Sequence, residues 1–399
     1  MKYVIKGETL FDGNNILNAN SVLIEDGIIK EVGNNIKSDD VREYKGAFIM
    51  PGMIDSHIHL TGAKSGNLIM ESLIEDPNIK LLATIPWLNK ILKAGFTTVR
   101  DCGGTNAIYL RNAIKNGYLT GPDIIAAGKP LSQTFGHGEF SHTIPIKWNE
   151  DRGMSEICDG TEGCIKGART VLRQGADFIK IFSTGGVLSQ SDRPDQEQFT
   201  VEEIRAIVNE ARKSGTYVAA HAHGDQGVKN AVISGVKSIE HATMASDETL
   251  KLMAEKNVSL TPTLSIQELL FKYGREIGVN SWGLEKITNV IDGIKQVLPK
   301  AKNLGINILC GTDLGFETGK DIDIGKNWNE LILMTKYGNM NAIEALRSAT
   351  GNVNNIGIHR GRLSIGYKAD VLIINGEPSE NISDIAKIDH VYLGGNEVF

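Results

Sequence analysis

Cysteine is scarce in this sequence, and so are the segments that direct a chain into or across a membrane. Four cysteines in 399 residues are too few for a disulfide framework, and the spacing of Cys158 and Cys164 matches no common zinc motif. There is no run of about 18 apolar residues, so we expect neither a membrane span nor a membrane partner. Residues 1–8 lack the apolar core of an export signal. We therefore expect a cytoplasmic protein whose cysteines are structural thiols.

The sequence also lacks an excess of positive charge. It contains 42 Lys and Arg against 48 Asp and Glu, which gives a formal net charge of -6. Nucleic-acid binding relies on clustered Lys and Arg, so this balance favours a small-molecule substrate and no nucleic-acid partner. Hydrophobic residues make up 41% of the chain and there are only 10 prolines, values that exclude disordered and fibrous proteins.

Both ends of the chain carry short apolar runs separated by Gly and Asn, a pattern typical of β-strands. These runs are residues 3–5, 21–24, 28–32 and 47–49 near the start, and 369–374 and 390–393 near the end. Chains longer than roughly 250 to 300 residues usually divide into more than one domain. This chain has 399 residues, so we expect two domains. We expect residues 1–50 and 361–399 to form one small β-sandwich domain.

Between these ends, apolar runs alternate with longer amphipathic stretches, as in repeated βα units around a parallel sheet. Eight strands are expected near residues 53–59, 97–102, 123–127, 177–183, 217–222, 237–241, 258–263 and 306–312. One helix has a clear start, because Thr200 and Glu203 have the spacing of a capping box. The pattern predicts an α/β fold, a (β/α)8 TIM barrel over residues 51–360.

Histidines gather where the expected strands end. Side chains two residues apart on a strand leave the same face, so His57 and His59 can enter one cavity. Either His221 or His223 follows the fifth expected strand, and His241 and Asp313 follow the sixth and the eighth. Histidine is a common nitrogen ligand of zinc, and this end of a barrel carries active sites. The pattern therefore indicates a metal centre.

Lys180 lies in the otherwise apolar strand Phe178 to Phe182, where a bare ammonium faces a large desolvation cost. One interpretation is a buried lysine paired with an acid such as Asp101. The other is a neutral amine that has added carbon dioxide to become a carbamate, whose two oxygens could bridge two metal ions.

With these residues the sequence resembles the amidohydrolase superfamily, which has His-x-His on the first strand, a carboxylated Lys on the fourth, His on the fifth and sixth, and Asp on the eighth. The segments 185–189, 220–224 and 238–242 are similar to the branch of Xaa-Pro dipeptidases and related carboxypeptidases, and parts of the chain resemble imidazolonepropionases. The resemblance covers nearly the whole chain, and it implies a metal-dependent hydrolase that holds two divalent metal ions, with zinc expected first.

Carried over residue by residue, the resemblance implies a ligand set and a group of substrate contacts. His57 and His59 bind the first metal with Asp313, His221 and His241 bind the second, and Lys180 joins both as a carbamate. His223 and His137 are expected substrate contacts, and Arg193 on the loop after the Lys180 strand is a candidate clamp for a substrate carboxylate.

The expected reaction is hydrolysis of an amide bond by a hydroxide that bridges the two metals. Asp313 acts as general base and then as general acid, while His137 or one metal polarises the carbonyl. Dipeptides and N-acyl amino acids are the expected substrates, with apolar ones favoured by loop aromatics. These aromatics are Phe135, Phe140, Trp148, Phe199, Tyr273 and Trp282.

Three alternatives stay open, and so does a homo-oligomer. A deaminase of the superfamily is disfavoured, because Lys180 is present and Gly224 stands where a deaminase carries an acid. A cyclic-amide hydrolase like imidazolonepropionase is compatible with the same residues. A catalytically silent scaffold is the alternative outside enzymes, but such proteins usually lose ligands that this sequence retains.

Overall fold

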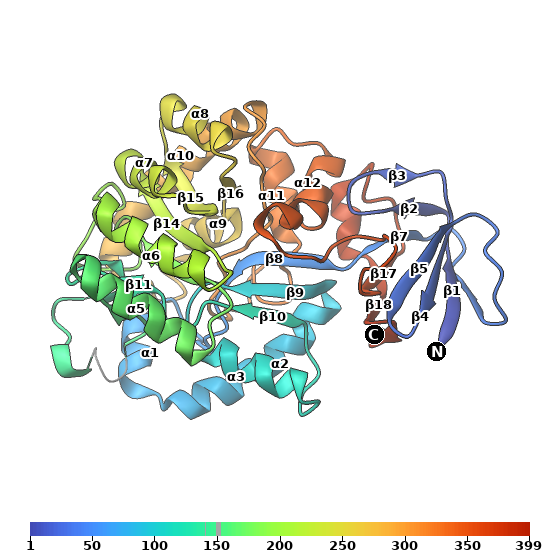
Figure 1. Ribbon diagram of the computed structural model, residues 1–399, viewed down its shortest axis with the longest axis horizontal. Coiled ribbons are helices and arrows are strands. Elements are labelled where there is room, and N and C mark those ends of the chain that lie inside the picture. Colours follow the sequence, from blue (N-terminus) through green and yellow to red (C-terminus); the bar gives the residue numbers. More distant parts are fainter. Residues whose placement is uncertain (140, 149–152) are drawn as a thin grey trace.

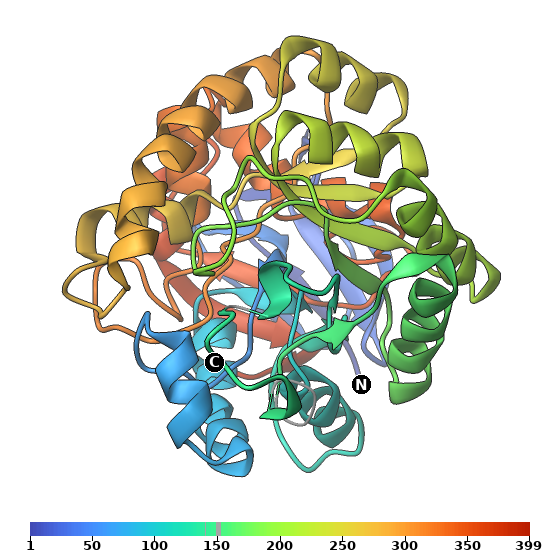
Figure 2. The same ribbon diagram turned by 90° about the vertical axis from the view of Figure 1, so that its left-hand side faces the viewer.

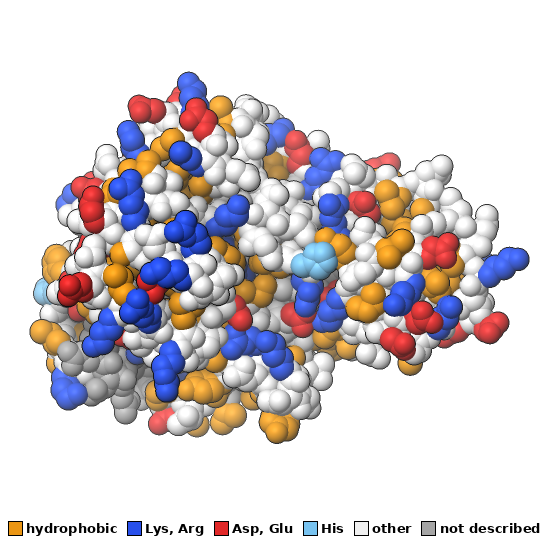
Figure 3. Space-filling view, viewed as in Figure 1, with side chains coloured by type: hydrophobic (Ala, Val, Ile, Leu, Met, Phe, Trp, Pro, Cys, Tyr) orange, Lys and Arg blue, Asp and Glu red, His pale blue; other side chains and the backbone are white. Residues whose placement is uncertain are grey.

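The computed structural model describes residues 1–139, 141–148 and 153–399. Figure 1 shows a larger part in which helices surround parallel strands and a smaller part made of strands from both ends of the chain. The two termini lie near each other at the smaller part. Among the described residues, no helix has the length and apolarity needed to cross a membrane. Figure 3 shows the surface in the view of Figure 1, where positively and negatively charged side chains both occur with hydrophobic side chains between them.

The larger part contains two parallel sheets. The first has the order β10-β9-β8 and the second the order β12-β11-β13-β14-β15-β16. Their strands are β8 (Met53–Ile58), β9 (Phe96–Asp101), β10 (Asp123–Ala126), β11 (Leu131–Ser132), β12 (Glu156–Ile157), β13 (Ile179–Phe182), β14 (Val218–Gly224), β15 (Ser238–Met244) and β16 (Ser259–Thr261). A ring of helices encloses these strands when the molecule is turned as in Figure 2. The expected mixed α/β fold with parallel strands is confirmed.

Backbone hydrogen bonds link the two sheets on both sides. Asp177 donates to the carbonyl of Ala126 over 2.7 Å, next to β10 and β13. On the other side, Ile308 forms a parallel bridge with Leu260 of β16, and Ser56 of β8 donates to Cys310 over 2.7 Å. The segment around Ile308 and Cys310 therefore runs in an extended form between β16 and β8 and connects the two sheets.

The expected strand at residues 306–312 is reduced to that single bridge. Its end must turn sharply, because Asp313 has a φ of 55° and Gly311 packs so closely that a Cβ atom there would lie 2.8 Å from the backbone of His57. Asp55 fixes the turn, since its carboxylate accepts hydrogen bonds from Thr312 (Oγ1, 2.7 Å) and Asn327 (Nδ2, 2.7 Å). This local geometry replaces regular strand pairing and brings Asp313 beside β8.

The helices lie between the strands and cover them. They are α1 (Leu68–Ile74), α2 (Pro77–Lys93), α3 (Asn106–Lys115), α5 (Gly160–Gln174), α6 (Val201–Lys213), α7 (Asp225–Ser234), α8 (Asp247–Glu255), α9 (Leu264–Tyr273), α10 (Ser281–Asn303), α11 (Asn329–Tyr337) and α12 (Ala342–Ser348). The predicted capping box is present at α6, where Thr200 and Glu203 each bond the other's backbone. Ile204, Ile207 and Ala211 form its buried face.

Strands from both chain ends pair in the smaller part. One sheet has the order β5-β4-β1-β6 and the other the order β19-β18-β17-β7-β2-β3. The strands are β1 (Lys2–Lys6), β2 (Thr9–Phe11), β3 (Ile16–Leu17), β4 (Ser21–Glu25), β5 (Ile28–Gly33), β6 (Val41–Glu43), β7 (Phe48–Pro51), β17 (Val371–Ile374), β18 (Ile388–Leu393) and β19 (Asn396–Glu397). Because β7 pairs antiparallel with β17, residues more than 300 positions apart share a sheet. Tyr3, Ile49 and Val371 lie in the same apolar cluster.

Candidate metal centre and substrate cavity

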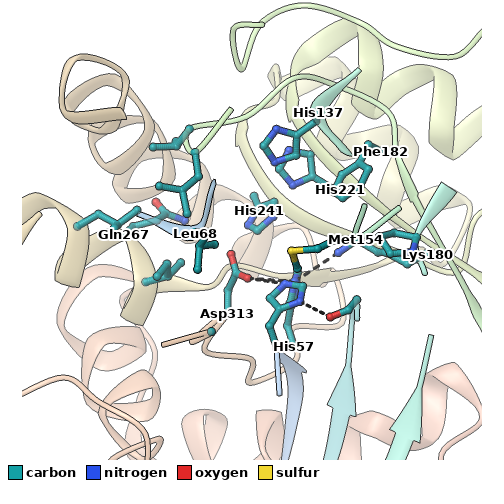
Figure 4. Close-up of a pocket in the computed structure, with 18 of the residues that line it drawn as sticks. His57, Leu68, His137, Met154, Lys180, Phe182, His221, His241, Gln267 and Asp313 are labelled. Carbon is teal, nitrogen blue, oxygen red and sulfur yellow. Dashed lines mark hydrogen bonds and ion pairs between the residues drawn. The ribbon is translucent and has the colours of Figure 1, made fainter. Parts of the chain in front are cut away.

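One cavity lies at the carboxyl ends of the parallel strands and collects most of the site residues expected from the sequence. Figure 4 shows histidines, Lys180 and Asp313 directed toward one another from different strands and from the loops that follow them. The predicted residues that line it are His57, His59, His137, Lys180, His221, His223, His241 and Asp313. The expectation that they meet at one end of the parallel strands therefore agrees with their placement.

The first histidine pair meets a carboxylate and an amine. Oδ1 of Asp313 lies 3.0 Å from Nε2 of His59 and 3.3 Å from Nε2 of His57. The same nitrogen of His57 lies 3.3 Å from Nζ of Lys180. Lys180 is only 1% exposed. Burial would raise the pKa of Asp313, but His57 and His59 lower it below its ordinary value. An ionised carboxylate thus stands between two imidazoles.

A buried ion pair fixes the orientation of His57. Its Nδ1 lies 2.9 Å from Glu240, and Glu240 also accepts hydrogen bonds from Arg100 (2.7 Å) and Ser238 (2.6 Å). Burial favours the neutral acid, yet Arg100 and His57 hold the pKa of Glu240 well below its usual range. An ionised Glu240 only accepts, so His57 carries its proton on Nδ1 and directs the lone pair of Nε2 toward Asp313 and Lys180.

Sequence analysis did not identify Arg100 or Glu240. Both side chains are completely buried, and Arg100 directly follows the uncharged stretch Phe96 to Val99 within β9. A charged residue within a buried strand is rare unless it is paired, which is the signal that could have singled out Arg100. Its partner lies 140 positions away, so no local pattern reveals the pair.

Three further histidines form the other side of the centre. The ring of His241 lies 4.6 Å from the rings of both His221 and His223, measured between centroids. The ligand nitrogens of the three lie within 4.8 Å of one another. Burial lowers the pKa of all three, to about 3 for His223 and well below the ordinary value for the other two, so they are neutral imidazoles. Both candidates for the fifth strand are therefore near His241.

Hydrogen bonds to threonine hydroxyls orient two of these rings. Nδ1 of His241 lies 2.7 Å from Oγ1 of Thr263, and Nδ1 of His223 lies 2.9 Å from Oγ1 of Thr243. The backbone of His241 has a φ of 81° and that of Thr263 a φ of 54°, values that cost free energy in residues other than glycine. Such strain is typical of residues that are held in place for function.

The donor chemistry fits divalent cations. His57, His241 and Asp313 offer ligand atoms within 4.8 Å of one another, as do the three histidines described above. Neutral imidazole nitrogens and a carboxylate oxygen are the ligands that zinc and related metals prefer. The residues present can therefore hold metal ions in this cavity.

The two remaining predicted substrate contacts are placed differently. His137 lies on the 3-10 helix η1 (His137–Glu139), borders the cavity and stacks on His221, with 4.6 Å between ring centroids. Arg193 is exposed, with 64% of its side-chain surface accessible, and pairs with Asp195 over 3.0 Å. It borders a separate hollow on the surface, so the structure does not bring Arg193 to the cavity.

An aliphatic wall faces the polar cluster, and the sequence analysis expected aromatic side chains in that role. Phe140 lies outside the described residues, and Phe135, Trp148, Phe199, Tyr273 and Trp282 are not among the described residues that line the cavity. The aliphatic side chains of the wall are Leu68, Met154, Val187, Leu188, Ile266, Leu270, Ile287 and Val290, and two aromatic rings that the sequence analysis did not name, Phe182 and Phe316, also line the cavity. The spacing of Ile287 and Val290 on α10 is the helical signal that could have indicated it.

Comparison with known proteins agrees with this geometry. The sequence profile of the amidohydrolase family matches residues 48–398. Ochratoxinase of Aspergillus niger is 31% identical over 417 aligned positions, which cover 96% of this chain and 83% of that protein. A prolidase crystallised with N-methylphosphonate-L-proline is 30% identical with a TM-score of 0.91, over 100% of this chain and 99% of the other.

A Xaa-Pro dipeptidase with methionine bound in its active site is 31% identical, with a TM-score of 0.88 over 100% of this chain and 99% of the other. The resemblance that the sequence motifs indicated is thereby confirmed. The chain belongs to the amidohydrolase family and is a hydrolase of carbon-nitrogen bonds.

Proposed function

We propose that this protein is a metal-dependent hydrolase that cleaves the amide bond of dipeptides or N-acyl amino acids. The observation that carries the proposal is the convergence of six imidazoles, Lys180 and Asp313 in one cavity whose remaining lining is mostly aliphatic. The polar side suits an amide carbonyl, and the aliphatic side suits an apolar side chain or acyl group. The similar prolidase and Xaa-Pro dipeptidase support this substrate class.

Six residues would hold the metals. His57, His59 and Asp313 would bind one ion, and His221 and His241 the other. Lys180, after its amine nitrogen has added carbon dioxide and released a proton, would contact both as a carbamate. Two divalent ions, with zinc proposed first, supply an activated water and polarise the substrate carbonyl when bound.

Side chains of the protein would carry out proton transfer, substrate orientation and the exclusion of water. Asp313 would take the proton of the attacking water and return it to the amine nitrogen as the carbon-nitrogen bond breaks, because an unprotonated amide anion is a poor leaving group. His137 and His223 would orient the substrate. The wall that includes Leu270 and Ile287 would exclude bulk water from the reacting atoms.

The proposed active site also depends on how the two parallel sheets and the end sheets are arranged. We propose that the two parallel sheets close through the segment around Ile308 into a (β/α)8 barrel over residues 51–360. The end sheets of residues 1–50 and 361–399 would form the small β-sandwich domain. The hydrogen bonds of Asp177 and Ser56 between the sheets support this arrangement.

Metal analysis and a substrate panel test the function together. We expect about two equivalents of metal and turnover of dipeptides or N-acyl amino acids. Asp313→Asn keeps the size of the side chain but removes the base, so kcat should fall by at least about a hundredfold, whereas Asp247→Asn on the exposed start of α8 should change nothing. Wild-type turnover in a metal-loaded Asp313→Asn variant would exclude Asp313 as the base.

A further inference from the structure

The loop that follows β13 turns back over the cavity and bonds the ring of His137. Oγ of Ser189 lies 2.8 Å from Nδ1 of His137, and the same hydroxyl donates to the carboxylate of Asp192. Ser189 is 1% exposed and Asp192 is 5% exposed, so water competes little for these contacts. A buried chain of hydrogen bonds thus connects a carboxylate, a hydroxyl and an imidazole.

Asp192 also holds the backbone of His137 by a second route. Its carboxylate accepts from Nε2 of Gln198 over 3.1 Å, and Oε1 of Gln198 accepts from the backbone N–H of His137 over 3.0 Å. Burial works to raise the pKa of Asp192, but the bonds with His137 and Ser189 and the charge of Lys286 outweigh it and lower the pKa below its ordinary range. Asp192 is therefore ionised.

The number of protons on these three groups determines which one donates in each hydrogen bond. An ionised carboxylate accepts only, so the single hydroxyl proton of Ser189 goes to Asp192. The oxygen of Ser189 can then only accept from His137, which requires a proton on Nδ1. In the neutral ring the lone pair is consequently on Nε2.

Close packing restricts the ring of His137 to one position. A Cβ atom on Gly186 would lie 2.3 Å from Cε1 of His137, so the ring fills the space that a side chain would need. The ring lies nearly parallel to that of His221, at an angle of 20°. Nζ of Lys286 on α10 donates to the carbonyls of Gly186 (3.0 Å) and Ser189 (2.6 Å) and thereby pins the loop.

Oδ2 of Asp192 also lies 3.6 Å from Nδ1 of His137. We propose that Asp192, acting through Ser189 and through this direct contact, is a positioning residue that keeps His137 protonated on Nδ1 and so assigns substrate recognition to Nε2. The tautomer stands on the hydrogen bonds alone, while its consequence for turnover rests on the proposed function of His137 as a substrate contact. The loop motif from Gly185 to Asp192 thereby has a role separate from metal binding.

The tautomer can be read directly in the full chain loaded with zinc. Selective 15N labelling of histidine and a long-range 1H-15N spectrum distinguish a protonated ring nitrogen from an unprotonated one, and His137→Ala assigns the signal. We expect a protonated Nδ1 in the wild type and in Ser189→Thr, a partial loss in Ser189→Ala, where Asp192 remains 3.6 Å from Nδ1, and a full loss in Asp192→Asn. Ser191→Ala is the matched control, because Ser191 bonds His142 instead. An unprotonated Nδ1 in the wild type, or one unchanged by both variants, would overturn the proposal.

Kinetics separate a positioning role from a structural one. Ser189→Ala should lower kcat/KM about tenfold, as expected when one hydrogen bond of about 1.4 kcal/mol is lost, with unchanged metal content and with recovery in Ser189→Thr. In a His137→Ala background the same change should have an effect below about twofold, because the two residues act as a unit. Equal losses in both backgrounds would contradict the proposal. A wild type that hydrolyses no dipeptide or N-acyl amino acid would refute the proposed function, and the spectrum would still decide the tautomer.

Discussion

A buried lysine amine is stable only where its surroundings compensate for lost hydration, and Lys180 is 1% exposed. Asp101, the partner that a simple ion pair would require, instead accepts hydrogen bonds from the backbone of Leu60 (2.7 Å) and Gly103 (3.0 Å). Nζ of Lys180 lies 3.3 Å from Nε2 of His57. Lys180 lines the same cavity as both groups of histidines, a position that suits the carbamate proposed to contact two metal ions.

We expect Lys180→Ala to lose most of its activity and part of its metal, because the proposed carbamate bridge is gone. Short carboxylic acids such as acetate should restore part of the rate by occupying the same space, and they should not affect the wild type. Metal content and turnover are measured with and without the acid. Full activity of the variant without added acid would disprove the carbamate.

Glu240 should control metal affinity although it is not one of the six proposed metal ligands. Glu240→Gln weakens the acceptor of the His57 Nδ1 proton, and loss of such a partner typically lowers metal affinity by about tenfold to a hundredfold. Competition with a chelator measures this change.

Stability gives an independent test of the same ion pair. Glu240→Ala leaves Arg100 buried without its partner and should cost about 3 to 5 kcal/mol of unfolding free energy, measured by urea denaturation. An Arg100→Met, Glu240→Met double variant removes both charges and should recover much of that loss. If the double variant is no more stable than Glu240→Ala, the unpaired charge is not the cause.

At the scale of elements, the start of α9 depends on a side chain from α11. Thr263 precedes α9 in a left-handed conformation and offers no side-chain cap. Glu330 replaces the cap, accepting from the backbone of Leu264 (2.9 Å) and Ser265 (2.7 Å). Because Thr263 also bonds His241, the carboxyl group of Glu330 indirectly stabilises the backbone of the site.

This arrangement predicts a pH dependence of stability. Burial raises the pKa of Glu330 from 4.5 to about 8. Between these values the folded protein holds a proton that the unfolded chain releases, so the contribution of Glu330 is complete below about pH 4.5 and is lost as the pH rises through about 8. Urea denaturation between pH 5 and 9 should show a fall in stability for the wild type and a smaller fall for Glu330→Gln. Equal slopes would contradict the raised pKa.

Elements with a local signal were predictable, and those fixed by distant contacts were not. The period of strands placed His57 and His59 on one face, and the capping box placed the start of α6 at Thr200. The expected strand at 306–312 fails because Asp55 and the close approach of Gly311 bend it. That bend depends on side chains more than 250 positions away, which no window of sequence contains.

At the scale of the molecule, sequence patterns could name the polar half of the cavity but not its apolar half. Strand ends meet at one edge of parallel sheets, which is why the histidines and Asp313 could be grouped in advance. Loops and helices carry no such constraint. Arg193 and Asp192 are neighbours on one loop, yet Arg193 faces solvent and Asp192 is 5% exposed.

The apolar half of the cavity predicts a preference for apolar substrates. Leu270, Ile287 and Val290 offer aliphatic surface in the same cavity as the proposed metal ligands. Each buried methylene contributes about 0.8 kcal/mol, so N-acyl leucine should exceed N-acyl alanine in kcat/KM by about tenfold or more. Leu270→Ser should reduce this ratio, and Leu304→Ser on the exposed end of α10 is the matched control. A ratio near one in the wild type would disprove a role for the wall.

The polar half predicts recognition of a substrate carboxylate. Lys180 is the one lysine or arginine among the described residues that line the cavity, and as a carbamate it would be negative, so His137 and His223 are the proposed donors. A charge-assisted hydrogen bond contributes about 1.5 to 3 kcal/mol, so converting the carboxylate of a preferred substrate to an amide should lower kcat/KM by about tenfold to a hundredfold. The assay compares acid and amide at equal metal loading, in the wild type and in His137→Ala, where the difference should shrink. Equal rates for acid and amide, or turnover confined to cyclic amides, would refute carboxylate recognition and leave the assignment to the amidohydrolase family intact.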